Sequence, residues 1–412
     1  MPYRIYNFNM NIIFIANDAV GDGMSGGDRI WMNFVKYWRK KINIILMCSE
    51  DANNMLIRGL VKNEIIDITH IIITAKKGNS ANFNNLINLF KYQIKRTFKG
   101  IKMVYHNLEL VKNSDFVYSS SDFYPDLMPA FFAKIINKRI KWIAGYYLIA
   151  PFPISDSTPY KSTQRLKGFI YWLMQKLSLF IVKHFADYVF VTSEPDVKRF
   201  TSKRVDNSKV IVVKGGVDIK ASENYMKEAN IIPIEKRKYD ACYVGRFHPQ
   251  KGVLELIDIW NILRGRGINA KLAIIGCGEL EEKIVNKINE YDINDNIKIL
   301  GFLDGKEKYE VFRNSKMILH PAIYDSGGMA MAEGMAFGLP GVSFDLEALK
   351  SYYPKGVLKV PCFNLEAFAN VITQLLKDKE LYDKFSREAL EYTKTWDWEE
   401  RANFIFSQIF NN

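Results

Sequence analysis

Short runs of β-branched and other apolar residues, each followed by a loop or a helical stretch, recur along the whole chain and limit the folds that it can adopt. Strands of this uniformly apolar type are typical of buried parallel sheets with helices on both faces. The pattern therefore predicts an α/β chain of two doubly wound domains in tandem. The predicted strands are 11–16, 42–47, 115–118, 140–144, 187–192 and a run from 210 in the first half, and 240–245, 271–275, 297–300, 316–320 and 341–344 in the second.

The length of the chain agrees with two domains. A single hydrophobic core rarely organises as many as 412 residues, so two cores are expected. We place the boundary at 218, just after the strand that runs into Gly215 and Gly216. No low-complexity tract or short repeat is present, which excludes solenoids and propellers.

Charge and cysteine content bear on partners and location. Residues 1–220 contain 32 Lys and Arg against 17 Asp and Glu, whereas residues 221–412 contain 25 against 28. Such asymmetry indicates an anionic partner, such as a membrane surface or an acceptor, or else a solvated basic face. The four cysteines show no paired spacing, and the apolar run 11–16 is too short for a signal sequence. We expect a cytoplasmic protein without a disulfide framework.

Residues 165–185 predict a strongly apolar helix. Eight residues recur at helical spacing, and Trp172 and Leu179 widen the stripe: Leu166, Phe169, Ile170, Leu173, Leu177, Phe180, Ile181 and His184. The uninterrupted apolar part is shorter than the roughly 20 residues that span a bilayer. Two interpretations remain: a core helix, or a helix lying on an anionic membrane surface with its lysines and arginine at the headgroups.

The segment 324–340 is the most informative motif. It follows the strand that ends at His320, and its glycines Gly327 and Gly328 let backbone N–H groups approach a ligand. A helix from Met329 would direct its positive end at an anion. Glu333, one turn inside that helix, can accept hydrogen bonds from a vicinal diol such as ribose. Asp325 or Ser326 can instead be simple helix caps.

Three more glycine loops follow strands of the second half. Gly245, Arg246 and Lys251 follow the first, and two cations at the carboxyl end of a strand would neutralise a diphosphate. A solvated basic turn is the alternative. Gly276 and Gly301 mark the next two loops, so the glycine turns together would form a cleft. The full G-x-G-x-x-G fingerprint is missing, so no nicotinamide cofactor is predicted.

A glycine loop also separates the first strand from a helix predicted over 30–40. Gly26 and Gly27 in this loop would contribute N–H groups to a phosphate from the opposite side of an interdomain cleft, or they would simply allow a tight turn.

The chain resembles the retaining glycosyltransferases of family four, which have the GT-B fold of two facing Rossmann-like domains around an interdomain cleft. The resemblance covers most of the chain and is strongest over 240–345, through the motifs 244–252, 274–279 and 325–340. It implies an acceptor domain over 1–218, a nucleotide-sugar domain over 219–390, and a final helix in 391–412 that packs back on the first domain.

The resemblance also implies roles for single residues. Arg246 and Lys251 would bind the donor diphosphate, and Glu333 the ribose. Asp325, with the loop from Ser326 to Met329, would bind the transferred sugar. The backbone around Gly301 and Phe302 would meet the base.

Two departures from the family pattern stand out. The family usually has glutamate where this chain has Asp325, which is shorter by one methylene group. The usual histidine of the first domain is absent from the stretch 142–149. Tyr146 or Tyr147 would replace it, or both are core or rim aromatics.

The implied reaction is retaining transfer of a sugar from a nucleoside diphosphate sugar to a hydroxyl of a glycan or lipid-linked acceptor, without metal or other cofactor. A GT-B epimerase, a phosphorylase and a non-catalytic sugar-nucleotide scaffold are the alternatives. We expect no nucleic-acid partner, because the basic half contains no recognisable binding motif. The protein would work in the cytoplasm, with residues 165–185 as a peripheral contact to the membrane.

Overall fold

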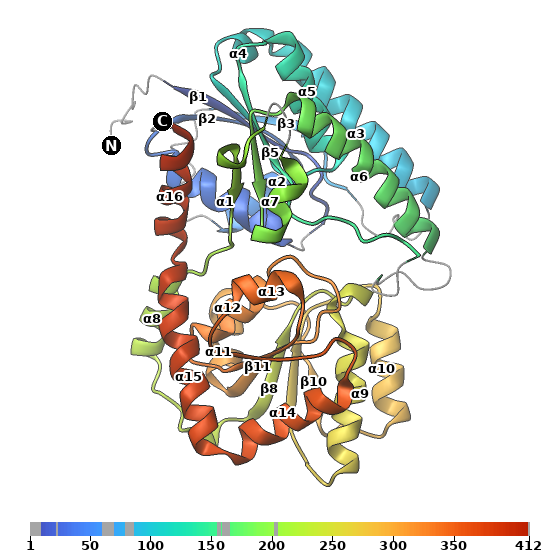
Figure 1. Cartoon of the computed structure of the whole chain (residues 1–412), viewed down its shortest axis with the longest axis vertical. Coiled ribbons are helices and arrows are strands. Elements are labelled where there is room, and N and C mark those ends of the chain that lie inside the picture. The colour runs from blue at the N-terminus through green and yellow to red at the C-terminus, as the bar shows by residue number, and fades with distance from the viewer. Residues whose placement is uncertain are drawn as a thin grey trace. The chain divides into compact units, whose positions relative to one another are not determined.

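The computed structural model describes residues 10–21, 24–59, 70–78, 86–154, 158, 165–201 and 205–410. The chain divides into two compact units (Figure 1). The first unit comprises Met1–Ser155, Ser162–Lys214 and Glu399–Asn412, and the second comprises Asp156–Lys161 and Gly215–Trp398. The boundaries predicted from the sequence were 218 and 390, whereas the division in the structure falls after Lys214 and after Trp398.

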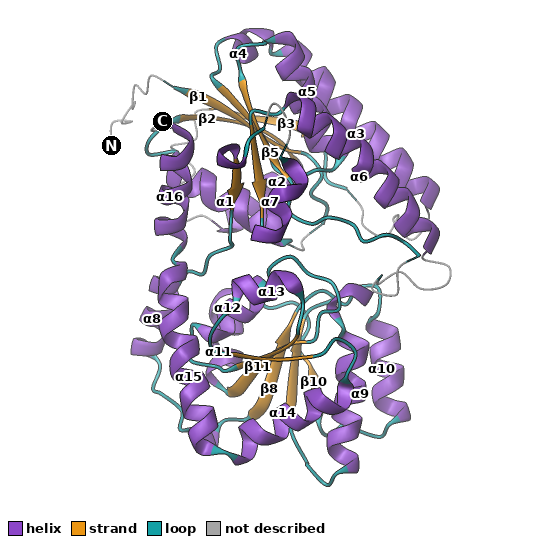
Figure 2. Ribbon diagram, viewed as in Figure 1, coloured by secondary structure: helices purple, strands orange, loops and turns teal. Residues whose placement is uncertain are grey.

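The described residues of the first unit form a seven-stranded parallel sheet in the order β3-β2-β1-β4-β5-β6-β7. Helices flank the sheet on both sides (Figure 2). The strands are β1 (Asn11–Ala16), β2 (Asn43–Ser49), β3 (His70–Ala75), β4 (Phe116–Ser119), β5 (Lys141–Gly145), β6 (Tyr188–Val191) and β7 (Val210–Val212). The helices are α1 (Gly26–Trp38), α2 (Glu50–Gly59), α3 (Leu86–His106), α4 (Leu108–Lys112), α5 (Tyr124–Ile136), α6 (Arg165–Phe185) and α7 (Glu194–Phe200).

The last helix, α16 (Trp398–Phe410), completes the first unit. The indole N–H of Trp38 in α1 donates to the carbonyl oxygen of Ala402 at 2.8 Å. The Trp38 ring also lies edge-on to Phe406 and Phe410. The end of the chain thus packs against a helix formed by its beginning.

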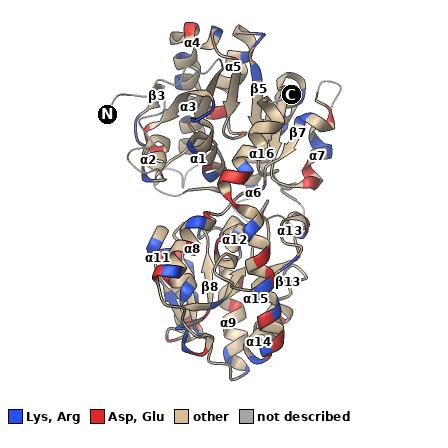
Figure 3. Cartoon of the chain, turned by 90° about the vertical axis from the view of Figure 1, so that its left-hand side faces the viewer, with Lys and Arg blue, Asp and Glu red and all other residues tan. Residues whose placement is uncertain are grey.

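The described residues of the second unit form a six-stranded parallel sheet in the order β10-β9-β8-β11-β12-β13. The strands are β8 (Tyr239–Val244), β9 (Leu272–Ile275), β10 (Ile297–Ile299), β11 (Ser315–His320), β12 (Gly341–Phe344) and β13 (Val357–Val360). The helices are α8 (Ile219–Glu228), α9 (Val253–Gly265), α10 (Glu281–Glu290), α11 (Gly305–Arg313), α12 (Met329–Met335), α13 (Glu347–Tyr352), α14 (Leu365–Lys377) and α15 (Lys379–Thr393). Acidic and basic residues are interspersed along α14 and α15 (Figure 3).

The two sheets confirm the predicted α/β class, although the strand prediction missed β3 and β13. Both lie at sheet edges. An edge strand pairs on one side only, but that alone does not explain the misses, because the edge strands β7 and β10 were predicted. In β3 the apolar run from Ile71 to Ile73 was available in the sequence, whereas β13 is short and contains Lys359.

The structure also corrects the loop predicted around Gly26 and Gly27. Both glycines belong to the first turn of α1, which begins four residues earlier than predicted. Ser25 and Asp28 form a capping box: the Ser25 hydroxyl accepts from the backbone N–H of Asp28, and the Asp28 carboxylate accepts from the N–H of Ser25. This S-x-x-D signal was available in the sequence.

Candidate functional site

The site in the second unit lies at the point in the sheet where the strand order reverses. Strands β8 and β11 are neighbours, but the chain leaves β8 toward β9 on one side and leaves β11 toward β12 on the other. At such a switch point the loops that follow two adjacent parallel strands diverge, and ligands of open α/β sheets bind there. The loop after β8 carries Arg246 and Lys251, and the loop after β11 carries Asp325.

The two loops are joined by an ion pair. The Nζ atom of Lys251 lies 2.6 Å from Oδ2 of Asp325, with side-chain exposures of 18% and 9%. The Nε2 atom of His320 lies 2.9 Å from the same oxygen. Oδ1 accepts the backbone N–H of Ser326 at 2.8 Å. Burial alone would raise the pKa of Asp325, but Lys251 and His320 outweigh it and hold that pKa well below its ordinary value.

The glycines after Asp325 are required by close packing. A Cβ atom on Gly327 would lie 2.6 Å from the Tyr352 ring, and one on Gly328 would lie 2.7 Å from Nε2 of His320. Gly328 also has φ +57°, and its carbonyl oxygen accepts the hydroxyl of Tyr353 at 2.7 Å. Helix α12 begins at Met329, as predicted, and extends for seven residues. The sequence argument had linked these glycines to a ligand alone and had not identified the two tyrosines.

Glu333 has a partner that the sequence analysis missed. Nζ of Lys308 lies 2.9 Å from Oε2 of Glu333 and 2.7 Å from Oδ1 of Asp304. The Lys308 side chain is only 3% exposed, so it is a cation buried between two carboxylates. The four-residue spacing of Asp304 and Lys308 on a helix was the only sequence signal. Glu333 therefore keeps an ionised neighbour that orients its carboxylate.

The remaining predicted residues of this unit surround the same strand ends. The N–H of Gly245 donates to the carbonyl of Ile275 at 3.0 Å, and the N–H of Gly276 donates to the carbonyl of Gly301 at 2.8 Å. The loops after β8, β9 and β10 are thus tied together. Phe302 is 46% exposed. Arg246 is exposed as well, and it forms no ion pair within the described residues.

In the first unit, Gly27 packs against Tyr147, because a Cβ atom on Gly27 would lie 3.1 Å from that ring. Tyr146 and Tyr147 are both buried. The Tyr146 hydroxyl donates to the carbonyl of Gln175 at 3.0 Å, and the Tyr147 hydroxyl is hydrogen-bonded to that of Tyr118. The structure therefore supports the core interpretation of both tyrosines.

The first sheet has its own switch point between β1 and β4, where the sequence analysis identified Gly26 and Gly27 but no acidic residue. Asp18 follows β1, and Asp122 and Asp126 follow β4. Burial raises the pKa of Asp18 to about 8, with Asp126 adding repulsion, and raises the pKa of Asp122 to about 7. Burial also raises the pKa of Asp126 to about 6, although four hydrogen bonds to its oxygens oppose the shift.

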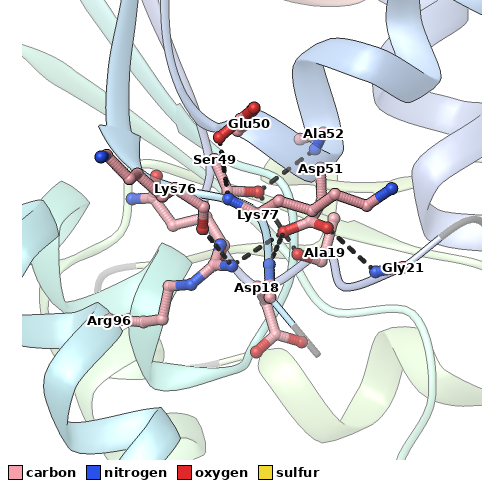
Figure 4. Close-up of polar contacts among 12 residues, drawn as sticks. Asp18, Ala19, Gly21, Ser49, Glu50, Asp51, Ala52, Lys76, Lys77 and Arg96 are labelled. Atoms are coloured by element: carbon pink, nitrogen blue, oxygen red, sulfur yellow. Dashed lines mark hydrogen bonds and ion pairs between the residues drawn. The ribbon is translucent and has the colours of Figure 1, made fainter. Parts of the chain in front are cut away.

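A second polar network holds the loop after β1 in place (Figure 4). The Asp51 carboxylate accepts backbone N–H groups from Gly21 at 3.1 Å and Gly78 at 2.9 Å. It also pairs with Nη2 of Arg96 at 2.8 Å, and both side chains are buried. Arg96 donates further to the carbonyl of Asn17. All these partners lie within the cluster, so we regard the network as structural.

Helix α6 has the predicted bounds, but the core interpretation holds for only part of its apolar stripe. Ile181 is buried in the core of the first unit and Leu179 packs against that core. Five other residues of the stripe are exposed: Leu166, Phe169, Leu173, Leu177 and Phe180. None of the described helices is both long and apolar enough to cross a membrane. Among the described residues, no group of three His, Cys, Asp or Glu side chains is placed to hold a metal ion. All four cysteines are free.

Comparisons with known proteins agree with this geometry. A crystal structure of Anabaena HepE in complex with UDP and glucose matches with a TM-score of 0.69 at 15% identity, over 97% of this chain and 99% of that chain. The chain has the GT-B fold. Residues 225–392, which contain the switch point and its ion pairs, match the family model "Glycosyl transferases group 1".

Two curated relatives carry related names. The chain is 23% identical over 183 residues to the poly(glycerol-phosphate) alpha-glucosyltransferase of Bacillus subtilis, which covers 44% of this chain and 26% of the relative. It is 24% identical over 241 residues to the amylovoran biosynthesis glycosyltransferase AmsD of Erwinia amylovora, covering 57% and 62%. Each alignment spans less than two thirds of the relative. The names favour sugar transfer over an epimerase, a phosphorylase or a scaffold.

Proposed function

We propose that the chain is a retaining glycosyltransferase that moves a sugar from a nucleoside diphosphate sugar to an acceptor hydroxyl in the synthesis of a glycan, polysaccharide or glycolipid. The observation that carries the proposal is the ion pair between Lys251 and Asp325 at the switch point of a part of the chain that matches the group 1 glycosyltransferase model. Arg246 lies on the same loop as Lys251 and is exposed. The two relatives named above are glycosyltransferases, and the Anabaena neighbour contains UDP and glucose.

In this proposal the donor diphosphate lies beside Arg246 and Lys251. The exposed, planar guanidinium of Arg246 can donate hydrogen bonds to two phosphate oxygens at once. Lys251 keeps Asp325 as a partner and still has N–H groups to donate, because an ammonium carries three. Asp325 and the backbone from Ser326 to Met329 then hold the sugar. Glu333, oriented by Lys308, accepts from the ribose hydroxyls, and Gly301 and Phe302 meet the base.

The proposed chemistry requires stabilisation of a leaving group. The bond between the anomeric carbon and the diphosphate oxygen breaks, and negative charge develops on that oxygen. Arg246 and Lys251 stabilise the charge as fixed, preorganised cations. The acceptor hydroxyl forms the new bond on the same face of the sugar, and its proton goes to the departing diphosphate. The proposal involves no metal ion, because these two cations supply the positive charge.

We also propose that the protein acts at the cytoplasmic face of a membrane. Helix α6 would lie on an anionic surface with its exposed stripe of apolar residues inward. The acceptor is then a glycan or a lipid-linked molecule. Vesicle sedimentation at low salt tests this contact, and a chain that stays unbound to anionic vesicles would contradict it.

The decisive experiment for the donor site is calorimetric titration of UDP, GDP and ADP into the wild type and into Lys251→Ala. Lys316→Ala is a matched control, because Lys316 pairs with Asp240 at 2.7 Å across the same two strands, at their amino ends. We expect one nucleotide to bind selectively, with affinity reduced at least tenfold by Lys251→Ala and unchanged by Lys316→Ala. Binding of no nucleotide, or equal loss in both variants, would remove the basis of the proposal.

A further inference from the structure

A pocket of about 540 Å³ lies within the first unit, between the start of α3, the segment leading into α5, and α6. This volume lies within the range of ligand sites. Its wall is mainly apolar and includes Leu86, Leu89, Phe90, Phe123, Ile170 and Met174. A compact protein fills such a space with its own side chains, so an open apolar pocket of this size indicates a ligand with apolar groups.

Helices α3 and α6, the two long helices beside the pocket, differ from ordinary surface helices in the residues that they bury. The residues that α3 buries are Gln93, Arg96, Gly100 and Val104, and those that α6 buries are Gly168, Gln175, Ser178, Ile181 and Val182. Many of their large apolar side chains are exposed instead. On α3 these are Ile87, Phe90, Ile94 and Phe98, and on α6 they are Leu166, Phe169, Leu173, Leu177 and Phe180. Phe98 is 67% exposed and Leu166 is 58% exposed. Exposed apolar stripes of this length mark an interaction surface.

The positive charge of α3 and α6 indicates which kind of partner their exposed surface binds. Neither α3 nor α6 contains a single Asp or Glu, whereas the two helices together carry nine Lys and Arg. Lys91 and Lys167 line the pocket itself. Apolar side chains flanked by cations are the combination that binds an anionic lipid surface. The narrow apolar pocket adds room for a hydrocarbon chain, which a flat protein interface would not need.

The polar side chains that line the pocket connect it to the switch point of the first sheet. Asp122 and Gln93 both line the pocket. Asp122 follows β4, and Gln93 donates from Nε2 to Oδ1 of Asp18, which follows β1, at 2.8 Å. Gln175 donates from Nε2 to Oδ2 of Asp122 at 2.7 Å. Oε1 of Gln93 is buried and accepts no hydrogen bond from any described residue. Carboxylate and amide oxygens of this kind accept hydrogen bonds from hydroxyl groups.

We infer that the pocket between α3 and α6 binds the acceptor, and that this acceptor is an anionic membrane lipid with a hydroxyl-bearing head. Its hydrocarbon chain lies against Phe90, Ile170 and Met174, its phosphate pairs with Lys91 and Lys167, and its hydroxyls lie beside Gln93 and Asp122. The apolar stripes of α3 and α6 rest on the membrane from which the lipid comes. The identification of this ligand as the acceptor rests on the proposed function; the lipid site itself does not.

The test is calorimetric titration of dihexanoyl phosphatidylglycerol, kept below its micelle-forming concentration, into the full chain. Ile170→Trp fills the pocket, and Lys91→Glu reverses a charge in its lining. Leu177→Trp is the matched control, because Leu177 is exposed on the same helix but does not line the pocket. Far-ultraviolet circular dichroism confirms the fold of each variant. We expect saturable binding to the wild type, at least tenfold weaker binding to Ile170→Trp and Lys91→Glu, and no change in Leu177→Trp.

The inference is overturned by no binding, by equal weakening in Leu177→Trp, or by equally tight binding of dihexanoyl phosphatidylcholine. Concentration-dependent self-association without lipid binding would instead assign the surface to a protein partner and would also overturn it. Nucleotide titration of the same samples separates the two proposals. A chain that binds a nucleoside diphosphate but not the lipid loses only this inference. If the chain binds the lipid but no nucleotide, the lipid site is supported and the proposed function is contradicted.

Discussion

Lys251 and Asp325, 74 positions apart in the sequence, place Nζ and Oδ2 only 2.6 Å from each other. The pair closes the switch point of the second sheet and is largely shielded from water. Breaking a shielded ion pair by removing one partner is costly, because the other charge remains buried. The pair therefore has a role in stability that can be measured apart from any role in binding.

Replacement of Lys251 by methionine should lower the free energy of unfolding by about 2 to 4 kcal/mol. The cost arises because the Asp325 carboxylate keeps only His320 and one backbone N–H nearby. Adding Asp325→Asn to Lys251→Met should recover much of the loss, because no buried charge is then left unpaired. Urea unfolding of the two single variants and the double variant gives the coupling energy. Strictly additive effects would show that the pair does not stabilise the fold.

The proposed contact between Glu333 and ribose can be tested on the ligand as well as on the protein. Removing the 2′ and 3′ hydroxyls from the nucleoside diphosphate that binds should weaken its binding to the wild type about tenfold, or about 1.4 kcal/mol. In Glu333→Ala the two ligands should bind equally. Glu310→Ala, on the adjacent helix α11, should retain the difference. If Glu333→Ala still discriminates between the ligands, the carboxylate does not contact the diol.

Replacement of Asp122 by asparagine should stabilise the protein more at pH 8 than at pH 4. Burial raises the pKa of Asp122 to about 7, whereas an unfolded aspartate titrates near pH 3.9. Between these values the unfolded chain releases the proton and the folded chain keeps it, so stability falls as the pH rises from about 4 to about 7. The amide cannot ionise, and the gain at pH 8 should be on the order of 2 kcal/mol.

Asp325→Asn is a control for Asp122→Asn, because its effect on stability should depend on pH in the opposite direction. The pKa of Asp325 is lowered in the folded state, so its stabilising effect is present above the unfolded pKa near 3.9 and is lost in stronger acid. This substitution should destabilise the protein at pH 7, and the loss should shrink progressively as the pH falls below about 3.9. Urea unfolding across the pH range measures both variants, and parallel curves for the two would contradict both assignments.

Gly328→Ala should destabilise the second unit by about 2 to 3 kcal/mol. Part of the cost is the left-handed backbone at φ +57°, which is worth about 1 to 2 kcal/mol for a residue with a Cβ atom. The rest comes from contact with His320 at 2.7 Å. Gly305→Ala separates the cost of the left-handed backbone from the cost of the contact. Gly305 has a similar φ of +56°, but the space around its Cβ position is open. Thermal unfolding should therefore show a smaller loss for Gly305→Ala, and equal losses would mean that the contact with His320 relaxes freely.

The predicted elements differ in how well local sequence specified them. All eleven predicted strands and the bounds of α6 could be read from local patterns, because buried parallel strands are apolar along their whole length. The edge strand β13 was missed because it is only four residues long and contains Lys359, whereas β3 was missed although its run of three isoleucines is a local signal. The start of α1 was missed although its capping box is a local signal.

The sequence analysis could not assign Lys308 to the site, because its partner Glu333 lies on a different helix. Likewise, Tyr352 and Tyr353 gave no local indication that they pack against the loop of Gly327 and Gly328. Contacts of this kind depend on which elements become neighbours, and residue spacing within a motif carries no information about that.

By itself the sequence determined the α/β class, the positions of most strands along the chain and the loops that carry the candidate chemistry, because hydrophobic period and glycine position act over a few residues. Only the tertiary structure decided that the loops after β8 and β11 meet, that Lys251 faces Asp325, and that the apolar stripe of α6 stays exposed. Strand order and helix orientation are set by the packing of the whole core. A stripe of leucine and phenylalanine looks the same in the sequence whether it faces that core or is left for a partner.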